Sequence, residues 1–315
     1  MKMTTVCVCH HSALSLATGF ATLARMCAGK MRSEIAARDC RFYELEIRIS
    51  SAMSVSVTSS LASVEGPLLG CALLIGSPFT AQLIARSGYD WVVIDMEHAP
   101  LSPLEVSHMV HSVVTASAGK CLPLVRLPSH GVEWIKRTLD CGAPGIVVPM
   151  VNNAKEMEEV VQRVRYPPRG YRSFGPYLAP FADLDHTATV DKYLNETSKE
   201  VALFPLIESV EAIENAEEIL SIDGVTGVMV GPYDLRSSMG LPGGFGTEEQ
   251  FVKAIEKVGG ICKRLGKPAG TAARDEAAAS QLTKAGYRML LTGSDAAVMV
   301  DGAKSKIAKY RANID

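Results

Sequence analysis

The sequence predicts an α/β protein folded as a (β/α)8 barrel. From about residue 67, short apolar and β-branched runs alternate with amphipathic stretches of helical length, which is the pattern of parallel βαβ units. Eight such runs are present, and eight is the number that closes a barrel. Polar side chains follow several of these runs directly. In a barrel those positions meet at one face, so the sequence predicts an enzyme.

The predicted strands are short and mostly apolar, and they cover residues 68–75, 91–95, 122–126, 145–150, 202–208, 225–231, 267–271 and 288–293. Helical patterns lie between them, at residues 103–116, 132–141, 154–164, 210–220, 247–265 and 275–285. Because crossovers between parallel strands are right-handed, we expect all the strands to run parallel. Acidic residues follow Thr247, so we expect Thr247 to cap the helix that begins there.

Two connections stand out by composition or length. Residues 240–246 are rich in glycine but follow a loop instead of a strand, so they are interpreted as a mobile loop and not as a phosphate cradle. The lack of a glycine-rich nucleotide turn in the sequence also disfavours the alternative architecture, a doubly wound open sheet. Residues 165–200 form an unusually long connection, for which we expect a rim, a lid or a subunit contact.

Charge and hydrophobicity limit the possible partners. The 315 residues include 32 basic and 34 acidic side chains, a formal net charge of −2, so no electrostatic footprint for nucleic acid is present. No apolar run reaches the roughly 18 residues of a transmembrane helix, so no membrane partner is expected. At 47% hydrophobic, the chain can bury a large core, and small metabolites are the expected partners.

Cysteine usage and the N-terminal composition bear on location. The eight cysteines include no CxxC pair, which predicts free, buried thiols in a reducing compartment, the cytoplasm. Residues 1–33 contain no acidic residue and are rich in Ser and Ala. This fits a disordered leader, an untranslated stretch before Met53 or, as the alternative location, a mitochondrial transit peptide. We therefore predict an atypical extension at residues 1–60 and a catalytic barrel at residues 61–315.

Two carboxylates end adjacent predicted strands. Glu208 follows an apolar run directly, and Asp234 follows the next one. Neighbouring strands lie about 5 Å apart, so both side chains are expected to point into one pocket. Two carboxylates without a paired Cys or His favour a hard, oxygen-preferring cation such as Mg2+ or Mn2+. The alternative is that each carboxylate caps the helix that follows it.

Three further polar residues lie near strand or helix ends. His98 follows the second predicted strand beside Asp95 and Glu97, which makes it a candidate general base. Arg126 ends an apolar strand, where a buried guanidinium is expected to face a carboxylate or an enolate. Asp140 ends a helix, and its position alone indicates a surface acid. The other histidines lack a comparable context: His10, His11, His108, His111, His130 and His186.

Several segments occur in a diagnostic order: SPFTAQLIARSGYDWVVIDMEHAPL, VRLP, IKRTLDCGAPGIVVPMVNNAKE, RYPPRGYRSFGP, LIES and GPYDL. From Ser77 to the C-terminus, the chain resembles the HpcH/HpaI family of class II, metal-dependent pyruvate aldolases. An ordered set of this size is highly specific. The resemblance implies a (β/α)8 TIM barrel of the phosphoenolpyruvate/pyruvate-domain type.

The resemblance also implies roles for the residues at the strand ends. Glu208 and Asp234 would bind a divalent cation, Mg2+, Mn2+ or Co2+, and Arg126 would stabilise the pyruvate enolate. His98 would be the base, acting through a water, and Asp140 would hydrogen-bond to it and raise its basicity. All these residues stand at the positions that the family pattern requires.

Further implications concern the substrate and the assembly. The backbone amides of Tyr233 and Asp234 would hold the pyruvate carboxylate. The last helix, near residues 295–310, would be exchanged between subunits of a hexamer built as a trimer of dimers. The resemblance therefore implies a homo-oligomer.

Two positions depart from the family pattern. Leu206 stands where many members have a glutamine two residues before the metal-binding Glu208, which removes an amide that can contact the substrate. Arg236 stands where Ser or Ala often follows the GPxDL segment. Two interpretations of Arg236 are open: it adds a positive charge near the aldehyde acceptor, or it lies on the helix surface.

The implied activity is that of a carbon–carbon lyase, which reversibly cleaves a 4-hydroxy-2-oxo acid to pyruvate and an aldehyde through a metal-stabilised enolate. Its small-molecule partners would be a keto acid and an aldehyde. No lysine is well placed at a strand end, so Schiff-base chemistry is not expected. The alternatives are an oxaloacetate decarboxylase, a citrate-lyase-β-like acyl-CoA lyase, for which Arg169 and Arg172 hint at a basic groove, and a non-catalytic barrel.

Overall fold

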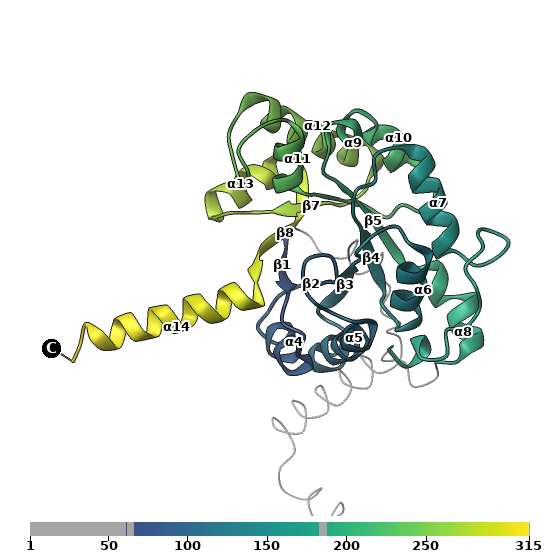
Figure 1. Cartoon of the computed structure of the whole chain (residues 1–315), viewed down its shortest axis with the longest axis horizontal. Coiled ribbons are helices and arrows are strands. Elements are labelled where there is room, and N and C mark those ends of the chain that lie inside the picture. Colours follow the sequence, from purple (N-terminus) through teal and green to yellow (C-terminus); the bar gives the residue numbers. More distant parts are fainter. Residues whose placement is uncertain (1–60, 62–65, 183–187, 315) are drawn as a thin grey trace, which may run out of the picture. The chain divides into compact units, whose positions relative to one another are not determined.

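The structure, a computed structural model, describes residue 61, residues 66–182 and residues 188–314. Its parallel strands close into a barrel in which each strand pairs with its neighbours in the chain and β8 pairs with β1 (Figure 1). The predicted (β/α)8 fold is therefore confirmed. The strands are β1 (Leu68–Leu73), β2 (Trp91–Asp95), β3 (Leu122–Arg126), β4 (Gly145–Val148), β5 (Ala202–Ile207), β6 (Val228–Val230), β7 (Ala269–Ala272) and β8 (Tyr287–Ser294). The predicted extension at residues 1–60 lies outside the described residues.

Helices follow the strands around the barrel (Figure 1). They are α4 (Pro78–Ala85), α5 (Pro103–Ser117), α6 (Val132–Asp140), α7 (Ala154–Val164), α8 (Val190–Asn195), α9 (Val210–Glu214), α10 (Ala216–Ser221), α11 (Pro232–Ser238), α12 (Glu249–Leu265), α13 (Glu276–Lys284) and α14 (Asp295–Arg311), with the 3-10 helices η1 (Ala179–Ala182) and η2 (Thr197–Lys199). In the described part of the chain, no helix has the length and apolar character needed to cross a membrane.

The predicted elements differ from the structure in detail. The helix expected at residues 210–220 is two short helices, α9 and α10, that meet at Asn215. The short helix α4 was not predicted. The expected cap at Thr247 is wrong: α12 begins at Glu249, and Glu248 is its N-cap residue. The Glu248 side chain does not cap the helix because it is paired with Arg236.

Alternate side chains of the strands fill the barrel interior. This apolar core includes Trp91, Val93, Leu122, Leu124, Val147, Phe204, Leu206 and Met229. Because side chains along a strand alternate in direction, the next inward positions after Val93, Leu124 and Leu206 are Asp95, Arg126 and Glu208. The sequence thus places a polar layer on top of an apolar one, at the carboxyl ends of the strands.

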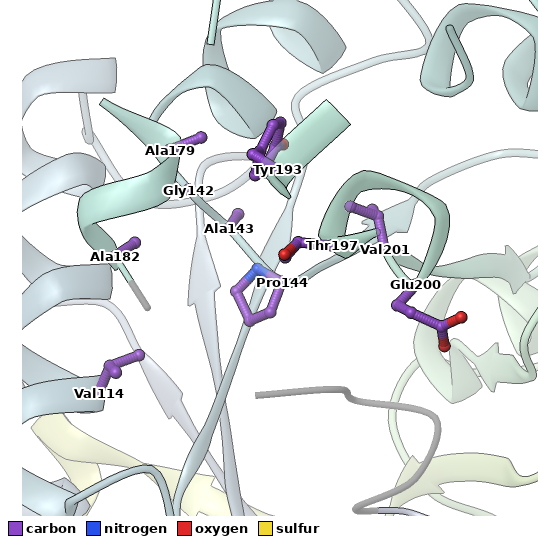
Figure 2. Close-up of a pocket in the computed structure, with 10 residues that line it drawn as sticks. All are labelled: Val114, Gly142, Ala143, Pro144, Ala179, Ala182, Tyr193, Thr197, Glu200 and Val201. Atoms are coloured by element: carbon purple, nitrogen blue, oxygen red, sulfur yellow. The ribbon is translucent and has the colours of Figure 1, made fainter. Parts of the chain in front are cut away.

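The long connection at residues 165–200 packs at the opposite end of the barrel. Buried Arg165 donates hydrogen bonds to the carbonyls of Ser198 and Val201, just before β5 begins. A small cavity of about 30 Å3, enough for one or two waters, lies between this segment and the turn at Gly142 before β4 (Figure 2). The described part of the segment therefore covers the amino ends of the strands, and it is not a lid over the polar layer.

The last helix, α14, points away from the barrel (Figure 1). Its first residue, Asp295, is buried and accepts hydrogen bonds from the backbone amides of Leu74 (3.0 Å) and Ile75 (3.1 Å). Beyond that anchor the helix leaves apolar side chains exposed, among them Val298, Met299, Val300, Ile307 and Tyr310.

The cysteines of the described residues are free and buried, in agreement with the predicted thiols: Cys71, Cys121, Cys141 and Cys262. Burial raises the pKa of Cys71, Cys121 and Cys262 to about 12. A thiol is a poor nucleophile when its pKa is this high, so these side chains are packing residues.

Candidate active site

Arg126 and Asp95 form the base of the polar layer. They are partners in the register of β2 and β3. Arg126 donates from Nε to Oδ1 of Asp95 (2.9 Å) and from Nη2 to Oδ2 (2.6 Å). This fork fixes the guanidinium plane. Burial acts to raise the pKa of Asp95, but the hydrogen bonds and charge of Arg126 outweigh it, and the pKa lies below its usual range.

Asp95 also shapes the turn that follows β2. Its Oδ1 accepts hydrogen bonds from the backbone amides of Glu97 (3.0 Å) and His98 (3.3 Å). Asp95 is therefore a positioning residue, since it holds both the guanidinium and the turn that carries the candidate base.

Glu97 lies at the centre of the cluster, although no role of its own was predicted for it. Its Oε2 is 3.2 Å from Nη1 of Arg126 and 3.7 Å from Nε2 of His98. This oxygen is buried and has no hydrogen-bond partner. Burial raises the pKa of Glu97, and the charges of Asp95 and Asp234 raise it further, against the opposing effect of Arg126 and His98. The position of Glu97 directly after β2 was the sequence feature from which its place in the cluster could have been predicted.

Glu208 is buried where β5 ends. The backbone amide of Met150 donates to its Oε1 (2.7 Å), and Met150 has a φ of 52°, a left-handed conformation that is uncommon for a side chain of this kind. A Cβ atom at Gly231 would lie 2.6 Å from Oε2 of Glu208, so the position needs glycine. Burial raises the pKa of Glu208 to about 7, and the charges of Glu97 and Asp234 add to the effect.

Asp234 lies in the first turn of α11, which follows β6, and its charge reaches both Glu97 and Glu208. Among the described residues, no three His, Cys, Asp or Glu side chains gather as a closed metal site. The donor set of Glu208 and Asp234 nevertheless fits a hard divalent cation, with water and substrate as further ligands. Burial and the neighbouring carboxylates raise the pKa of Glu208, so its negative charge is poorly compensated. A bound cation would compensate that charge.

The structure does not bring every predicted residue together. His98 lies at the mouth of the cluster, with 62% of its side chain exposed. Asp140 ends α6 just before β4 begins, so it lies at the opposite end of the barrel. There it accepts a hydrogen bond on Oδ1 from Nη2 of buried Arg172 (2.7 Å). Within one chain, Asp140 therefore does not contact His98.

The structure places Leu206 in β5 and Tyr233 in α11. Leu206 is buried inside the barrel, one inward position below Glu208. Tyr233 is the second residue of α11, and 55% of it is exposed.

A cavity of about 420 Å3 opens beside the cluster, lined by Glu97, Pro128, Ser129, His130, Gly131, Pro149, Met150 and Arg163. His130, for which no role was predicted, lies here with Nε2 at 2.5 Å from the carbonyl oxygen of Pro149. Its position in the loop after β3 was the sequence feature from which His130 could have been predicted to lie near the site.

A closed barrel with carboxylates and a guanidinium gathered at the carboxyl ends of its strands has the layout of a (β/α)8-barrel enzyme. Residues 71–302 match the HpcH/HpaI aldolase/citrate lyase family, and the chain belongs to that family. The resemblance stated from the sequence is therefore confirmed.

Individual relatives agree with this assignment. The chain is 35% identical over 254 residues to a hydroxypyruvate/pyruvate aldolase of Roseovarius nubinhibens, covering 80% of this chain and 95% of the relative. It is 33% identical over 264 residues to a 4-hydroxy-2-oxovalerate aldolase of Novosphingobium aromaticivorans, covering 83% and 98%. The crystal structure of an HpcH/HpaI aldolase/citrate lyase family protein from Burkholderia cenocepacia J2315 superimposes with a TM-score of 0.74 at 29% identity, covering 82% and 100%.

Proposed function

We propose that this chain reversibly cleaves a 4-hydroxy-2-oxo acid to pyruvate and an aldehyde, with the acidic cluster around Arg126 as its active site. The chain is a carbon–carbon lyase of the class II pyruvate aldolase type. The observation that carries the assignment of the site is the pairing of Arg126 with Asp95 and Glu97, beside Glu208, at the carboxyl ends of adjacent strands.

Class II aldolases of this family generally depend on a divalent metal ion. Glu208 and Asp234 would hold the cation, with Mg2+, Mn2+ and Co2+ as the candidates. When bound, it supplies Lewis acidity that makes the C3 protons of the keto acid more acidic and offsets the negative charge that develops.

Arg126 stabilises the enolate through its guanidinium. The fork to Asp95 aligns the side chain before substrate arrives, so no reorganisation is needed when charge develops. The backbone amides of Tyr233 and Asp234 bind the substrate carboxylate. Leu206 gives the floor below Glu208 an apolar surface where an amide would offer hydrogen bonds.

His98 moves the proton. In cleavage it takes the proton of the C4 hydroxyl through a water, the C3–C4 bond breaks, the aldehyde leaves, and the electron pair stays on the pyruvate enolate. The enolate is then protonated at C3 to give pyruvate. The exposed position of His98, on the turn that Asp95 holds, lets it reach a substrate at the mouth of the cluster.

Asp140 can serve His98 only across a subunit interface, because the two lie at opposite ends of one barrel. The exposed apolar residues of α14 support an assembly in which this helix is exchanged between copies of the chain, as in a hexamer. Mixing two inactive variants tests the idea. If Asp140→Asn and His98→Ala oligomers are exchanged, some sites combine an intact His98 with an intact Asp140 and activity returns. No recovery in verified mixed oligomers would remove Asp140 from the mechanism.

Two ion pairs argue against the alternative function, an acyl-CoA lyase. Arg172 is buried against Asp140, and Arg169 is paired with Asp223, so neither guanidinium offers an open groove to CoA phosphates.

The proposed function is tested by the exchange of the pyruvate C3 protons with deuterium. The exchange is monitored by NMR in the presence of Mg2+ or Mn2+ and in the absence of aldehyde. We expect exchange in the metal-loaded protein, and its absence would refute the proposal. Oxaloacetate assayed in parallel measures decarboxylation.

A further inference from the structure

The structure overturns one of the two interpretations of Arg236, because the side chain does not lie on the helix surface. It is buried in α11, with 2% of its surface exposed. Its Nη2 donates to Oε1 of Glu248 (2.8 Å), Nη1 contacts Oε2, and Nε donates to the carbonyl of Pro242 (3.0 Å). Its guanidinium lies 5.2 Å from the ring of Phe251. All the described contacts of this charge are thus made inside the fold.

These contacts fasten the glycine-rich loop at residues 240–247. Pro242 is held near its start and Glu248 directly after its end. A Cβ atom at Gly246 would lie 1.8 Å from Nη1 of Arg236, so any larger residue would push the guanidinium out of its present place. The loop predicted to be mobile is therefore tied down at both ends.

The fastened loop holds Phe245 against Tyr233 of α11. The ring of Phe245 meets the ring of Tyr233 edge to face, with centroids 5.5 Å apart. Tyr233 is next to Asp234 in α11 and is more than half exposed. The two rings thus form an aromatic wall that begins at the residue before Asp234.

The space behind the wall is mostly apolar. Phe245 also lines a cavity of about 610 Å3 with Pro232, Phe251, Ile255 and Thr271, near the carboxyl ends of β6 and β7. The charged residues of this cavity, Arg274, Glu256 and Lys284, are exposed at its rim. Arg274 is paired with Asp275 (2.9 Å). Because Arg236 is neutralised by Glu248, the wall carries no cation from α11 that would attract an anionic substrate.

We propose that Tyr233 and Phe245 form the subsite for the aldehyde half of the substrate, that this subsite selects uncharged aldehydes with an aromatic or bulky apolar substituent, and that the Arg236–Glu248 pair positions it. This inference rests on the proposed aldolase function. Phe245 makes the specificity contact. Arg236 and Glu248 act through the loop and are positioning residues.

Phe245→Ala in the full-length, metal-loaded protein tests the subsite. The kcat/KM for aldol addition is measured with pyruvate and three acceptors: benzaldehyde, propanal and glyoxylate. Dividing each value by that of the unchanged protein removes the intrinsic reactivity of the aldehyde. We expect the benzaldehyde value to fall roughly 3- to 10-fold more than the propanal and glyoxylate values, chiefly through KM, because an aromatic contact is lost. Pyruvate C3 exchange should be unchanged.

Two further variants separate position from contact. Glu248→Ala frees the loop and should shift the acceptor ratios in the same direction as Phe245→Ala, whereas Glu248→Gln, which keeps one acceptor oxygen for Arg236, should restore part of the preference. Phe181→Ala removes another exposed phenylalanine, in η1 at the other end of the barrel, and should shift nothing.

Equal losses for all three acceptors in Phe245→Ala, with exchange intact, would overturn the subsite and leave the aldolase proposal standing. A larger loss for glyoxylate would show that the wall serves anionic acceptors, which also contradicts the inference. If the unchanged protein exchanges no C3 protons, the proposed function fails and this inference fails with it.

Discussion

Asp95 and Arg126 are register partners on adjacent strands, and the carboxylate receives both Nε and Nη2 of the guanidinium. Two features of the barrel bring this pair together, the alternation of side chains along a strand and the register between strands. The period of two along each strand points both side chains into the barrel, and the parallel register brings them to the same height. The guanidinium that we propose to stabilise the enolate is thereby fixed before a substrate binds.

Arg126→Lys tests this fork. An ammonium keeps the charge but cannot match the planar, two-point contact with Asp95 or with a carboxylate. We expect the rate of pyruvate C3 exchange to fall by about 10²-fold or more in Arg126→Lys, and at least as far in Arg126→Ala. Near-normal exchange in the lysine variant would show that charge alone is sufficient and that the fork has no catalytic role.

His98→Ala should separate proton transfer from metal binding. Loss of a general base typically costs 10²- to 10⁴-fold in rate, so aldol turnover should fall by about that factor. The metal-induced rise in melting temperature should be unchanged, since His98 is not among the proposed ligands. His130→Ala, which removes the other histidine near the cluster, is the matched control. A lost metal response in His98→Ala would make His98 a ligand and not a base.

Several parts of the site followed from the sequence because they depend on strand periodicity alone. Residues that directly follow apolar strands, such as Arg126 and Glu208, had to meet at one end of a barrel. The role of Glu97 was not predictable, since its contacts depend on the turn that Asp95 holds. Arg236 and Glu248 are twelve residues apart, and their pairing depends on the path of an irregular loop.

The position of Asp140 follows from topology. A helix that follows a parallel strand runs back to the opposite end of the barrel, so its last residue lies far from the strand ends. A contact between Asp140 and His98 within one chain was therefore never available. The course of α14 could not be read from the sequence, because its apolar pattern would suit either its own barrel or that of a neighbour.

The Arg236–Glu248 pair predicts a defined acid sensitivity. The hydrogen bond from Arg236 holds the pKa of Glu248 at about 2, against an ordinary value of 4.5. Between these values the unfolded chain binds more protons at this site than the folded one. The stabilisation by the pair is therefore complete above pH 4.5 and is lost as the pH falls towards 2.

Melting temperatures measured from pH 7 to pH 3 test whether this stabilisation is lost as the pH falls. The Glu248→Gln protein should melt below the unchanged protein by a constant margin above pH 4.5, and the margin should shrink below it. Glu249→Gln, which removes the adjacent exposed carboxylate paired with Lys253, should show a smaller margin. A margin that grows as the pH falls would contradict the assignment.

A chain that begins at Met53 should fold and turn over normally. The closed barrel is formed by strands from Leu68 onwards, and the proposed site residues lie between Asp95 and Asp234. Circular dichroism and the aldol assay would be compared with the full-length protein. Insolubility or loss of turnover in the shortened chain would place residues 1–52 within the fold and move the predicted boundary.

Metal dependence gives the most direct test of the carboxylate pair. With two protein ligands, the cation should exchange readily, so EDTA should abolish activity and Mg2+, Mn2+ or Co2+ should restore it. Binding at about 100 times Kd stabilises a fold by about 2.7 kcal/mol, which for a domain of this size raises the melting temperature by several degrees. Glu208→Gln and Asp234→Asn keep the side-chain shapes but remove one charge each, so both should fold and show a smaller metal-induced rise. Glu211→Gln, which changes an exposed carboxylate in α9, should respond as the unchanged protein does. Full activity in excess EDTA, together with borohydride trapping of pyruvate on a lysine, would replace this mechanism with Schiff-base chemistry.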